Sequence, residues 1–377
     1  MDERNIDPER QLQAKRYARL NRRFMVIDLL FGLLYVGAWL VFGWSKVLRE
    51  ILAGLFNPEW LLIASFAFVF GGIYLLFNLP LSYYSGFVLP HRFELSNQNL
   101  SEWVADQFKG ILVGGLIGFI VLQVVYFVLR TYPETWWLWV AGFLLLFSVV
   151  LANLAPVLLM PLFYKFKPLE EEYAGLADRL VNLSQQAGAR VEGVYQFDMS
   201  RRTKAANAAL TGLGKTRRII LGDTLLKEFT DDEIETVLAH ELGHHVNRDI
   251  PLGIAIESLT TMLGLFLASL ALNLSVDYFG FEGVWDIAAL PLFLLVMGAY
   301  GLVTMPLGNA FSRWRERRAD EYALAATGKN QAYASALARL ANQNLADADP
   351  ERWVEFLLHS HPSLSSRIEM AKAKSVN

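Results

Sequence analysis

Six long apolar runs constrain this chain more than any other feature of its sequence. Each has about the 20 residues that a helix needs to cross a bilayer, where the backbone must satisfy its own hydrogen bonds. The alternative is a soluble protein with six core helices, but Trp and Tyr at several ends of the runs are typical of membrane interfaces. With 54% hydrophobic and 19% charged residues, the chain is predicted to be an integral membrane protein. The runs are Phe24–Trp44, Trp60–Leu79, Gly110–Leu129, Trp136–Pro156, Ile250–Leu274 and Ile287–Pro306.

The distribution of basic residues predicts the orientation of these spans. Cytoplasmic segments beside membrane helices carry an excess of Lys and Arg. The connection between the third and fourth runs has a single Arg, whereas the first 23 residues hold Arg4, Arg10, Lys15, Arg16, Arg19, Arg22 and Arg23. We therefore expect the N-terminus in the cytoplasm. Counting spans from there places the polar middle of the chain, and the arginine-rich stretch after the sixth run, on the same side.

The runs divide the chain into five predicted segments. A basic cytoplasmic segment is followed by four transmembrane helices, a cytoplasmic α+β segment, two further transmembrane helices and a cytoplasmic helical segment, with bounds 1–23, 24–156, 157–249, 250–308 and 309–377. In the α+β segment, "VEGVYQFDM" and "RRIILGDTLL" predict strands, and "TDDEIETVLAHELGHHV" predicts a helix with a polar cap. The expected fold class is mainly α: a bundle of about six membrane spans with a small α+β domain on the cytoplasmic side.

The stretch "HELGHH", at 240–245, carries the strongest chemical signal. Residues four apart share one face of a helix, so His240 and His244 can direct their imidazoles at one metal ion. Glu241 lies beside them and can reach a water on that ion. In zinc peptidases with this spacing, zinc acidifies the water and the glutamate takes its proton. Gly243 permits another element to approach this helix closely. Two idle histidines are the alternative, but unpaired polar groups directly before an apolar run would be costly.

Catalytic zinc usually takes three protein ligands, so one more must come from elsewhere in the chain. The sequence has no cysteine, which leaves nitrogen and oxygen donors. After the last apolar run, "RWRERRADEYAL" places Glu316 and Asp320 four residues apart on one helical face. One could bind zinc while the other orients a ligating histidine through its free N–H. An arginine-rich helix that balances its own charge is the alternative, but the predicted topology brings this stretch to the side of the histidines. The other candidates are Glu321, His91, His245, His359 and His361.

Several stretches together resemble one known family. "HELGHH" followed by "SRWRERRADEYAL" is similar to the type I CAAX prenyl protease family of integral-membrane zinc metallopeptidases. "LPLSYYSGFVLPHRF", "PLFYKFKPL", "SRRTKAANAALTGLGKTRRIILGDTLL" and "HSHPSLSSRIEM" look like landmarks of that family in the expected order. The resemblance covers most of the chain from about residue 79 to the C-terminus, and it is therefore specific.

The resemblance implies a gluzincin-type site that holds one Zn²⁺. Its implied zinc ligands are His240, His244 and Glu316. Glu241 would be the general base, and Asp320 would support a ligand from behind. The resemblance further implies that an Asn-Ala pair binds the substrate backbone and that a late histidine and arginine stabilise the oxyanion; the matching residues are Asn207, Ala208, His361 and Arg367.

The chain departs from the family pattern in three places. His245 stands where the family often has an aromatic residue, and Ser363 replaces a second proline after His361. The chain has six predicted spans, whereas the eukaryotic prenyl proteases have seven around a large intramembrane chamber. These departures bear on the chamber and on the preference for prenylated substrates.

The expected function is zinc-dependent hydrolysis of peptide bonds in membrane-associated substrates. The substrate is a peptide or a membrane protein, with or without a lipid anchor, and the net charge of −3 gives no reason to expect nucleic acid as a partner. Trimming of a prenylated C-terminal tripeptide and quality-control cleavage of membrane proteins are both open. The lack of a long insertion before the zinc helix favours a compact general endopeptidase of the bacterial inner membrane, with its active site facing the cytoplasm.

Two other classes of protein are weighed against this one. A transporter could use Asp28 and Glu257 as ion ligands inside the membrane. A transporter, however, gives no reason for the two metal-spaced motifs to share one side of the membrane. A zinc-bound scaffold without catalysis is the second alternative, but it has no need of Glu241.

Overall fold

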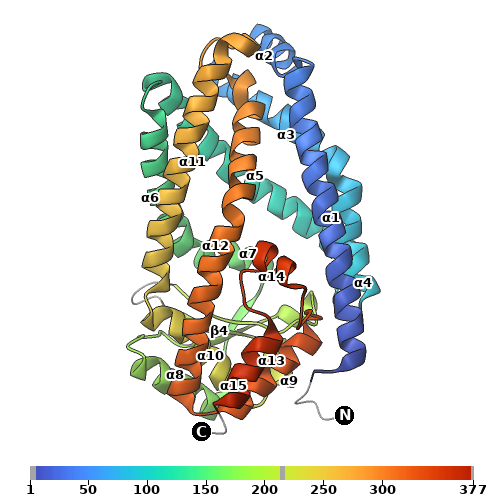
Figure 1. Cartoon of the computed structure of the whole chain (residues 1–377), viewed down its shortest axis with the longest axis vertical. Helices are drawn as coiled ribbons and strands as arrows, with labels where there is room; N and C mark the ends of the chain where they lie inside the picture. The colour runs from blue at the N-terminus through green and yellow to red at the C-terminus, as the bar shows by residue number, and fades with distance from the viewer. Residues whose placement is uncertain (1–5, 213–216, 375–377) are drawn as a thin grey trace.

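The computed structural model describes residues 6–212 and 217–374 and shows an elongated, mostly helical molecule (Figure 1). Among these residues, six helices are long and apolar enough to cross a membrane, and each overlaps one predicted run. They are Pro8–Val41, Glu59–Arg92, Leu100–Thr131, Trp136–Phe163, Asp249–Phe279 and Ile287–Thr327. Large apolar side chains on these helices are exposed, for example Leu34 at 71% and Leu146 at 70%. An apolar surface of this extent needs lipid around it, so the prediction of six membrane spans is confirmed and the soluble alternative is not.

The spans consist of helices of different lengths, two of them joined through π-helical turns. In chain order they are α1 (Pro8–Val41), α2 (Trp44–Leu55), α3 (Glu59–Tyr83), a π-helical turn (Tyr84–Val88), α4 (Leu89–Arg92), α5 (Leu100–Thr131), α6 (Trp136–Leu154), a second π-helical turn (Ala155–Leu159), α7 (Met160–Phe163), α11 (Asp249–Phe279), a 3₁₀ turn (Ile287–Ala289) and α12 (Leu290–Thr327). Pro90 follows the first π-helical turn and Pro156 lies in the second. Because proline cannot donate the helical hydrogen bond, such a turn lets a helix continue past it. The second and fourth spans therefore run beyond their predicted ends.

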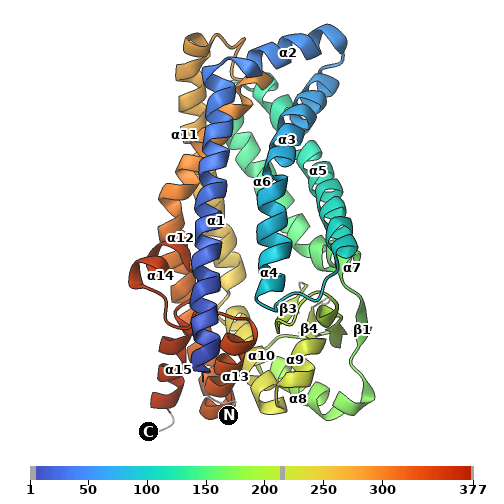
Figure 2. The same cartoon turned by 90° about the vertical axis from the view of Figure 1, so that its right-hand side faces the viewer.

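The apolar runs do not predict α2. The first run is expected to continue to Trp44, but α1 ends at Val41 because Gly43 adopts a left-handed conformation with φ of 69°. Trp44 instead begins α2, a helix of 12 residues. This helix lies at the end of the molecule farthest from the sheet (Figure 2).

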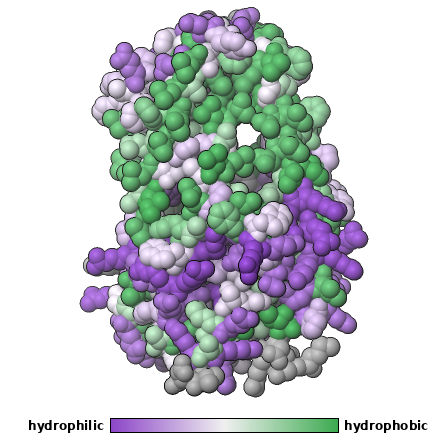
Figure 3. Space-filling model, in the orientation of Figure 1, coloured by the Kyte–Doolittle hydropathy of each residue, from purple (hydrophilic) through white to green (hydrophobic). Residues whose placement is uncertain are grey.

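The polar elements gather at the opposite end. They are β1 (Phe166–Pro168), a 3₁₀ turn (Glu171–Tyr173), α8 (Ala174–Gln186), β2 (Val194–Phe197), a 3₁₀ turn (Met199–Arg201), β3 (Ala208–Thr211), β4 (Arg218–Gly222), α9 (Asp223–Glu228), α10 (Asp231–Val246), α13 (Asn330–Gln343), α14 (Arg352–Leu358) and α15 (Leu364–Ala373). The start of α1 and the end of α15 lie at this end too, as an even number of spans requires (Figures 1 and 2). In Figure 3, hydrophobic residues predominate over the middle and upper part of the molecule, whereas hydrophilic residues predominate over the polar end and also occur at the opposite tip.

A small sheet forms part of the polar end. Its strand order is β1-β2-β4-β3, with β2 and β4 parallel and the outer strands antiparallel to them. The two predicted strands are present as β2 and β4. The sequence does not predict β1 and β3, which have three and four residues and lack a run of β-branched side chains. Because β3 is the last strand in the order of the sheet, it is an edge strand with one side open.

Helix α10, which carries "HELGHH", is anchored at its start and along one face. Thr230 and Glu233 form a capping box in which each side chain accepts a hydrogen bond from the other residue's backbone N–H. Ile234, Leu238 and Leu242 recur at four-residue spacing and are buried in the core of the polar end. The histidines therefore lie on a helix whose rotation about its own axis is fixed by packing.

Gly243 lets α10 and α12 approach each other closely. A Cβ atom at this position would lie 2.8 Å from the Cα and 2.9 Å from the carbonyl oxygen of Ala319. No side chain fits at these distances without moving a backbone. The role predicted for this glycine is therefore confirmed, and the packing determines how near the histidines come to the carboxylates of α12.

We expect Gly243→Ala to destabilise the protein by about 1–3 kcal/mol through overpacking, and to weaken its binding of zinc. The measurements are the thermal midpoint in detergent and a zinc competition titration. Gly175→Ala is the matched control, because a Cβ at this helical position meets nothing within 4 Å. Equal behaviour of the two variants would contradict the prediction.

Candidate metal centre

Two helices that are distant in sequence bring three potential metal ligands together. His240 and His244 come from α10 and Glu316 from α12, and one ligand atom from each lies within 4.8 Å of the others. The Nε2 atom of His240 is 3.2 Å from Glu316 Oε2, and the Nε2 atom of His244 is 3.4 Å from Glu316 Oε1. The two imidazole rings stand nearly perpendicular, at 86°. All three side chains thus converge on one point, as the sequence predicts.

A carboxylate supports each histidine from behind. The Nδ1 atom of His240 lies 2.8 Å from Asp320 Oδ1, and the Nδ1 atom of His244 lies 2.8 Å from Asp249 Oδ2. Each imidazole donates its Nδ1–H to a carboxylate, which leaves Nε2 as the free donor atom for a metal. The spacing of Asp320 from Glu316 predicts Asp320 in this position, whereas no sequence pattern predicts Asp249. The signal it offers is its place directly after the histidine helix, five residues beyond His244.

Behind Asp320 lies a buried cluster around Arg367. Its guanidinium donates to both oxygens of Asp320, at 2.9 and 2.6 Å, and lies 3.0 Å from the hydroxyl of Tyr333. Tyr333 also donates to Asp320. The same guanidinium lies 3.4 Å from His240 Nδ1, on the edge of the ring away from Glu316. These contacts differ from those of the oxyanion donor that the resemblance implies, because they place Arg367 behind a ligand.

The electrostatics of the site favour a bound cation. Burial lowers the pKa of His240, but the neighbouring carboxylates of Asp320 and Glu316 outweigh burial and raise this pKa to about 9. For His244, burial again lowers the pKa, but the neighbouring carboxylates of Glu316 and Asp249 together outweigh burial, so that the pKa is raised. The carboxylates therefore draw positive charge to the imidazoles, as a proton or as a metal ion.

Glu241 stands beside this group without belonging to it. Within the described residues its carboxylate takes part in no hydrogen bond or ion pair, so it is available to a substrate or a water. Burial raises the pKa of this carboxyl above its ordinary value, and the nearby histidines only partly oppose the effect. A raised pKa makes a carboxylate a stronger base.

His361 lies on the open side of the centre. Its Nε2 atom is 3.4 Å from Glu316 Oε1, and 58% of its side chain is exposed. Its Nδ1 atom is 2.9 Å from the hydroxyl of Ser360. The loop between α14 and α15 thus presents one imidazole to the space in front of the ligands, at the residue for which the family resemblance implies an oxyanion-stabilising role.

Asn207 and Ala208 lie at the start of the edge strand β3, which packs beside α10. The carbonyl of Asn207 accepts a hydrogen bond of 2.9 Å from the N–H of Gly222 and so faces β4. Because neighbouring residues of an antiparallel strand direct their backbone groups to opposite sides, those of Ala208 face the open edge. An extended peptide could add to the sheet there. The adjoining residues 213–216, which belong to the same sequence motif, lie outside the described part of the chain.

The residues present fit a zinc ion. Two imidazole nitrogens and one carboxylate oxygen form a common ligand set of catalytic zinc, which leaves a fourth position open. Glu316 Oε2 is buried without a hydrogen-bond partner in the described structure, although His240 Nε2 is near. A buried carboxylate oxygen of this kind is costly unless a cation satisfies it. The residues of the transporter alternative, Asp28 and Glu257, lie outside this group on α1 and α11.

Comparisons with known proteins agree with this site. Residues 170–375 match the model of peptidase family M48, and residues 3–165 match that of the CAAX prenyl protease N-terminal, five membrane helices. Over the second range, the described residues contain four helices of spanning length together with α2.

Individual relatives match over nearly the whole chain. An uncharacterized metalloprotease, YhfN, of Bacillus subtilis is 30% identical, over 97% of this chain and 86% of its own. CAAX prenyl protease 1 of Saccharomyces cerevisiae is 27% identical, also over 97% and 86%. The crystal structure of S. mikatae Ste24p superposes with a TM-score of 0.86 at 26% identity, covering 98% of this chain and 90% of that one.

The fold and the site together define an integral-membrane zinc metallopeptidase that crosses the membrane several times and acts on peptides or proteins. Within this class, the chain belongs to peptidase family M48, and its residues 3–165 match the N-terminal membrane helices of the CAAX prenyl proteases. Nothing in the comparisons supports a transporter or a scaffold. The roles of the individual site residues remain predictions.

We expect Asp249→Asn and Asp320→Asn each to weaken zinc binding about 10- to 100-fold, because the ligating imidazole loses its charged acceptor. Zinc competition against a fluorescent chelator measures the change. Asp178→Asn, an exposed position on α8, is the matched control. Unchanged zinc affinity in the Asp249 variant would show that this carboxylate does not support His244.

Proposed function

We propose that this protein hydrolyses peptide bonds of membrane-associated substrates at the centre formed by His240, His244 and Glu316. The convergence of these three side chains supports the proposal most directly, together with the carboxylate of Glu241 beside them, which has no hydrogen-bond or ion-pair partner among the described residues. A zinc ion held there supplies Lewis acidity, which polarises the scissile carbonyl and makes water easier to deprotonate. The three ligands keep one position open for these groups.

Glu241 acts as the general base. Its carboxylate takes a proton from the attacking water and then delivers this proton to the leaving amine, which must be protonated as the C–N bond breaks. Burial raises the pKa of this carboxyl, which makes its carboxylate a stronger base for the first of these steps.

His361 stabilises the oxyanion, and Arg367 acts through other residues. The imidazole of His361 lies on the open side of the ligands, where a donated hydrogen bond reaches the developing negative charge. Arg367 is instead held by Asp320 and Tyr333. We assign it a positioning role: it holds Asp320, and through Asp320 the ring of His240.

The substrate lies extended along the open edge of β3. The outward backbone N–H and C=O of Ala208 pair with it, and Asn207, which is exposed, flanks this position. Because β3 packs beside α10, a peptide on this edge passes in front of the metal ligands. Main-chain pairing of this kind binds many sequences, which suits a general endopeptidase.

The surroundings of the site support a substrate that comes from the membrane. α11 and α12 lead from the apolar half of the molecule directly to the metal centre (Figure 1). We place the site on the cytoplasmic side of a bacterial inner membrane, because the basic start of α1 lies at the same end. The compact chain favours cleavage of membrane proteins over dedicated trimming of prenylated termini, and lipid-anchored substrates remain within its chemistry.

We expect Glu241→Gln to lower kcat by about 10²–10⁴-fold while zinc stays bound, because the amide cannot accept the proton of the water. Cleavage of a membrane-protein substrate by the purified protein measures kcat, and a chelator should abolish wild-type cleavage until zinc is restored. His245→Gln is the matched control, since His245 is adjacent in sequence but outside the metal group. Undiminished cleavage by the Glu241 variant would refute the mechanism.

We also expect the protein to cleave an unmodified membrane substrate at least as efficiently as a farnesylated peptide of the CAAX type, because backbone pairing at β3 does not require a lipid group. The two kcat/KM values, measured in the same vesicles, decide the question. A farnesylated peptide cleaved alone would overturn the preference and leave the peptidase assignment standing.

A further inference from the structure

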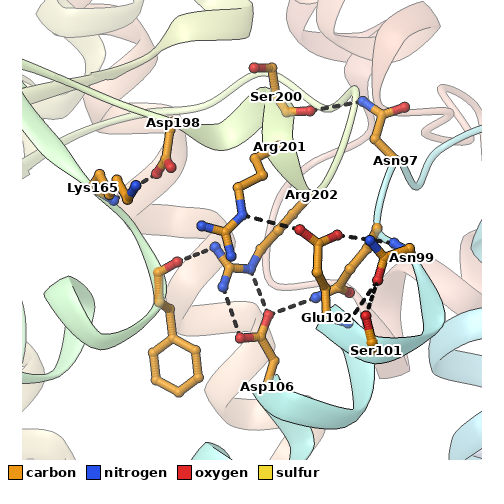
Figure 4. A network of polar contacts seen from close by, with 12 residues as sticks. Asn97, Asn99, Ser101, Glu102, Asp106, Lys165, Asp198, Ser200, Arg201 and Arg202 are labelled. Atoms are coloured by element: carbon orange, nitrogen blue, oxygen red, sulfur yellow. Dashed lines mark hydrogen bonds and ion pairs between the residues drawn. The ribbon is translucent and has the colours of Figure 1, made fainter.

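The segment before β3, residues 198–206 ("DMSRRTKAA"), is attached to the membrane part of the protein at several points. It belongs to a sequence motif in which only Asn207 and Ala208 have a proposed role. Figure 4 shows that Arg201 and Arg202 extend from this segment toward acidic side chains at the start of α5. These contacts suggest a use for the rest of the motif.

Arg202 is the centre of these contacts. Its Nε and Nη2 atoms donate to the two oxygens of Asp106, at 2.7 and 2.8 Å. Its Nη1 atom donates to the carbonyl of Phe163, at the end of α7, and the guanidinium lies 5.0 Å from the ring centre of Tyr164. Gln98 also donates to Asp106, at 2.6 Å. One side chain therefore ties the segment to two membrane spans.

The backbone of the same segment pairs with the connection between α4 and α5. The N–H of Asn97 donates to the carbonyl of Arg202 at 3.0 Å, and the N–H of Lys204 donates to the carbonyl of Leu95 at 3.0 Å. Thr203 donates its hydroxyl to the same carbonyl of Leu95, at 2.9 Å. The segment behaves as a short strand added to a loop of the membrane part.

On its other side, the segment is bound to the polar domain. Thr224 donates its hydroxyl to the carbonyl of Ala205 at 2.7 Å, and Asn344 accepts from the N–H of Ala206 at 2.8 Å. The next residue is Asn207, where the open edge of β3 begins. The segment therefore links the membrane helices to the surface on which the substrate is proposed to lie.

We propose that Arg202 is a positioning residue for substrate binding, and that its ion pair with Asp106 sets the place of the open edge of β3 relative to the metal centre. This inference rests on the proposed function of that edge. Only 11% of the Arg202 side chain and 15% of the Asp106 side chain are exposed. Removal of either charge leaves the other mostly shielded from water without its ion-pair partner, and the remaining contacts of Asp106 with Gln98 and of Arg202 with Phe163 do not replace the two parallel hydrogen bonds, so we expect the segment to shift.

Loss of the ion pair between Arg202 and Asp106 is expected to weaken substrate binding and to leave the chemical step unchanged. The metal ligands and Glu241 are held by α10 and α12, which the segment does not form. A displaced β3 edge loses main-chain hydrogen bonds that substrate and transition state share, and the loss of such uniform binding raises KM while kcat stays unchanged.

The test compares Arg202→Gln, Arg202→Lys and Asp106→Asn with the wild type. Two peptides share one scissile sequence, but only the longer reaches along β3. We expect the glutamine and asparagine variants to raise KM for the long peptide about 10- to 100-fold, with kcat, zinc content and KM for the short peptide close to wild type. The lysine variant should fall between, because it keeps the charge but not the two parallel hydrogen bonds.

Two further variants sharpen the result. The double variant Arg202→Gln/Asp106→Asn should be no worse than either single one, since both break the same interaction. Arg218→Gln is the matched control: its ion pair with Glu192, at 2.8 Å, lies in the same sheet but does not contact the segment.

An unchanged KM for the long peptide, or a joint fall of kcat and zinc content, would overturn the inference. If Asp106→Asn does not fold, Asp106→Glu keeps the charge but lengthens the side chain, and the KM of this variant for the long peptide decides instead.

Failure of this inference is distinct from failure of the proposed function. In the first case the wild type cleaves both peptides and Glu241→Gln does not; in the second, the wild type cleaves neither.

Discussion

The contact between α10 and α12 at Gly243 and Ala319 is the constraint on which the rest of the site depends. The two imidazoles belong to the helix before the fifth span, and the carboxylate belongs to the helix that continues from the sixth. Neither helix can form a metal centre alone. Because Gly243 has no side chain, the helix backbones nearly touch, and Glu316 and Asp320 come level with His240 on facing sides.

This arrangement concentrates negative charge in a buried place, and the structure balances it. Asp320 is fully buried, where a lone carboxylate would be prohibitive, yet it receives two hydrogen bonds from Arg367 and one from Tyr333. Asp249 is also buried and lies against His244. Among the described residues, the balance is incomplete at Asp249 Oδ1 and at Glu316 Oε2, which are both buried without a hydrogen-bond partner, and Glu316 Oε2 is the one that faces the histidines. A divalent cation held by the histidines would satisfy this oxygen.

The sequence predicts those parts of the molecule that follow a simple periodicity. Apolar runs of spanning length identify the six long helices, and the four-residue spacing of His240 and His244, repeated at Glu316 and Asp320, identifies the metal group. Features that depend on a single residue, or on the pairing of segments that are distant in sequence, are not predicted in this way. Gly43 breaks the first run and creates α2, while β3 acquires its extended form from pairing with β4 and not from its alanines.

The supporting residues of the site also divide into those that sequence spacing predicts and those that only tertiary packing determines. Asp320 is predictable because it lies one helical turn from a candidate ligand. Asp249 lies beyond the end of α10, after Arg248 takes a left-handed conformation, and no spacing rule links it to His244. The place of Arg367 depends on how α15 packs on α13, which is a tertiary property. The family resemblance identifies Arg367 as a site residue but does not predict the orientation of its side chain.

Helix α12 runs without interruption from the lipid-facing part of the molecule to the metal centre, and this continuity has a mechanical consequence. Glu316 lies about 15 Å along the helix axis from Pro306, where the apolar run ends. The two histidines are on a separate helix, α10, which is divided from the following span, α11, by the left-handed conformation of Arg248. Because α10 is packed against α12 at Gly243 and Ala319, a tilt of α12 in the bilayer would nevertheless be transmitted to the imidazoles as well as to the carboxylate.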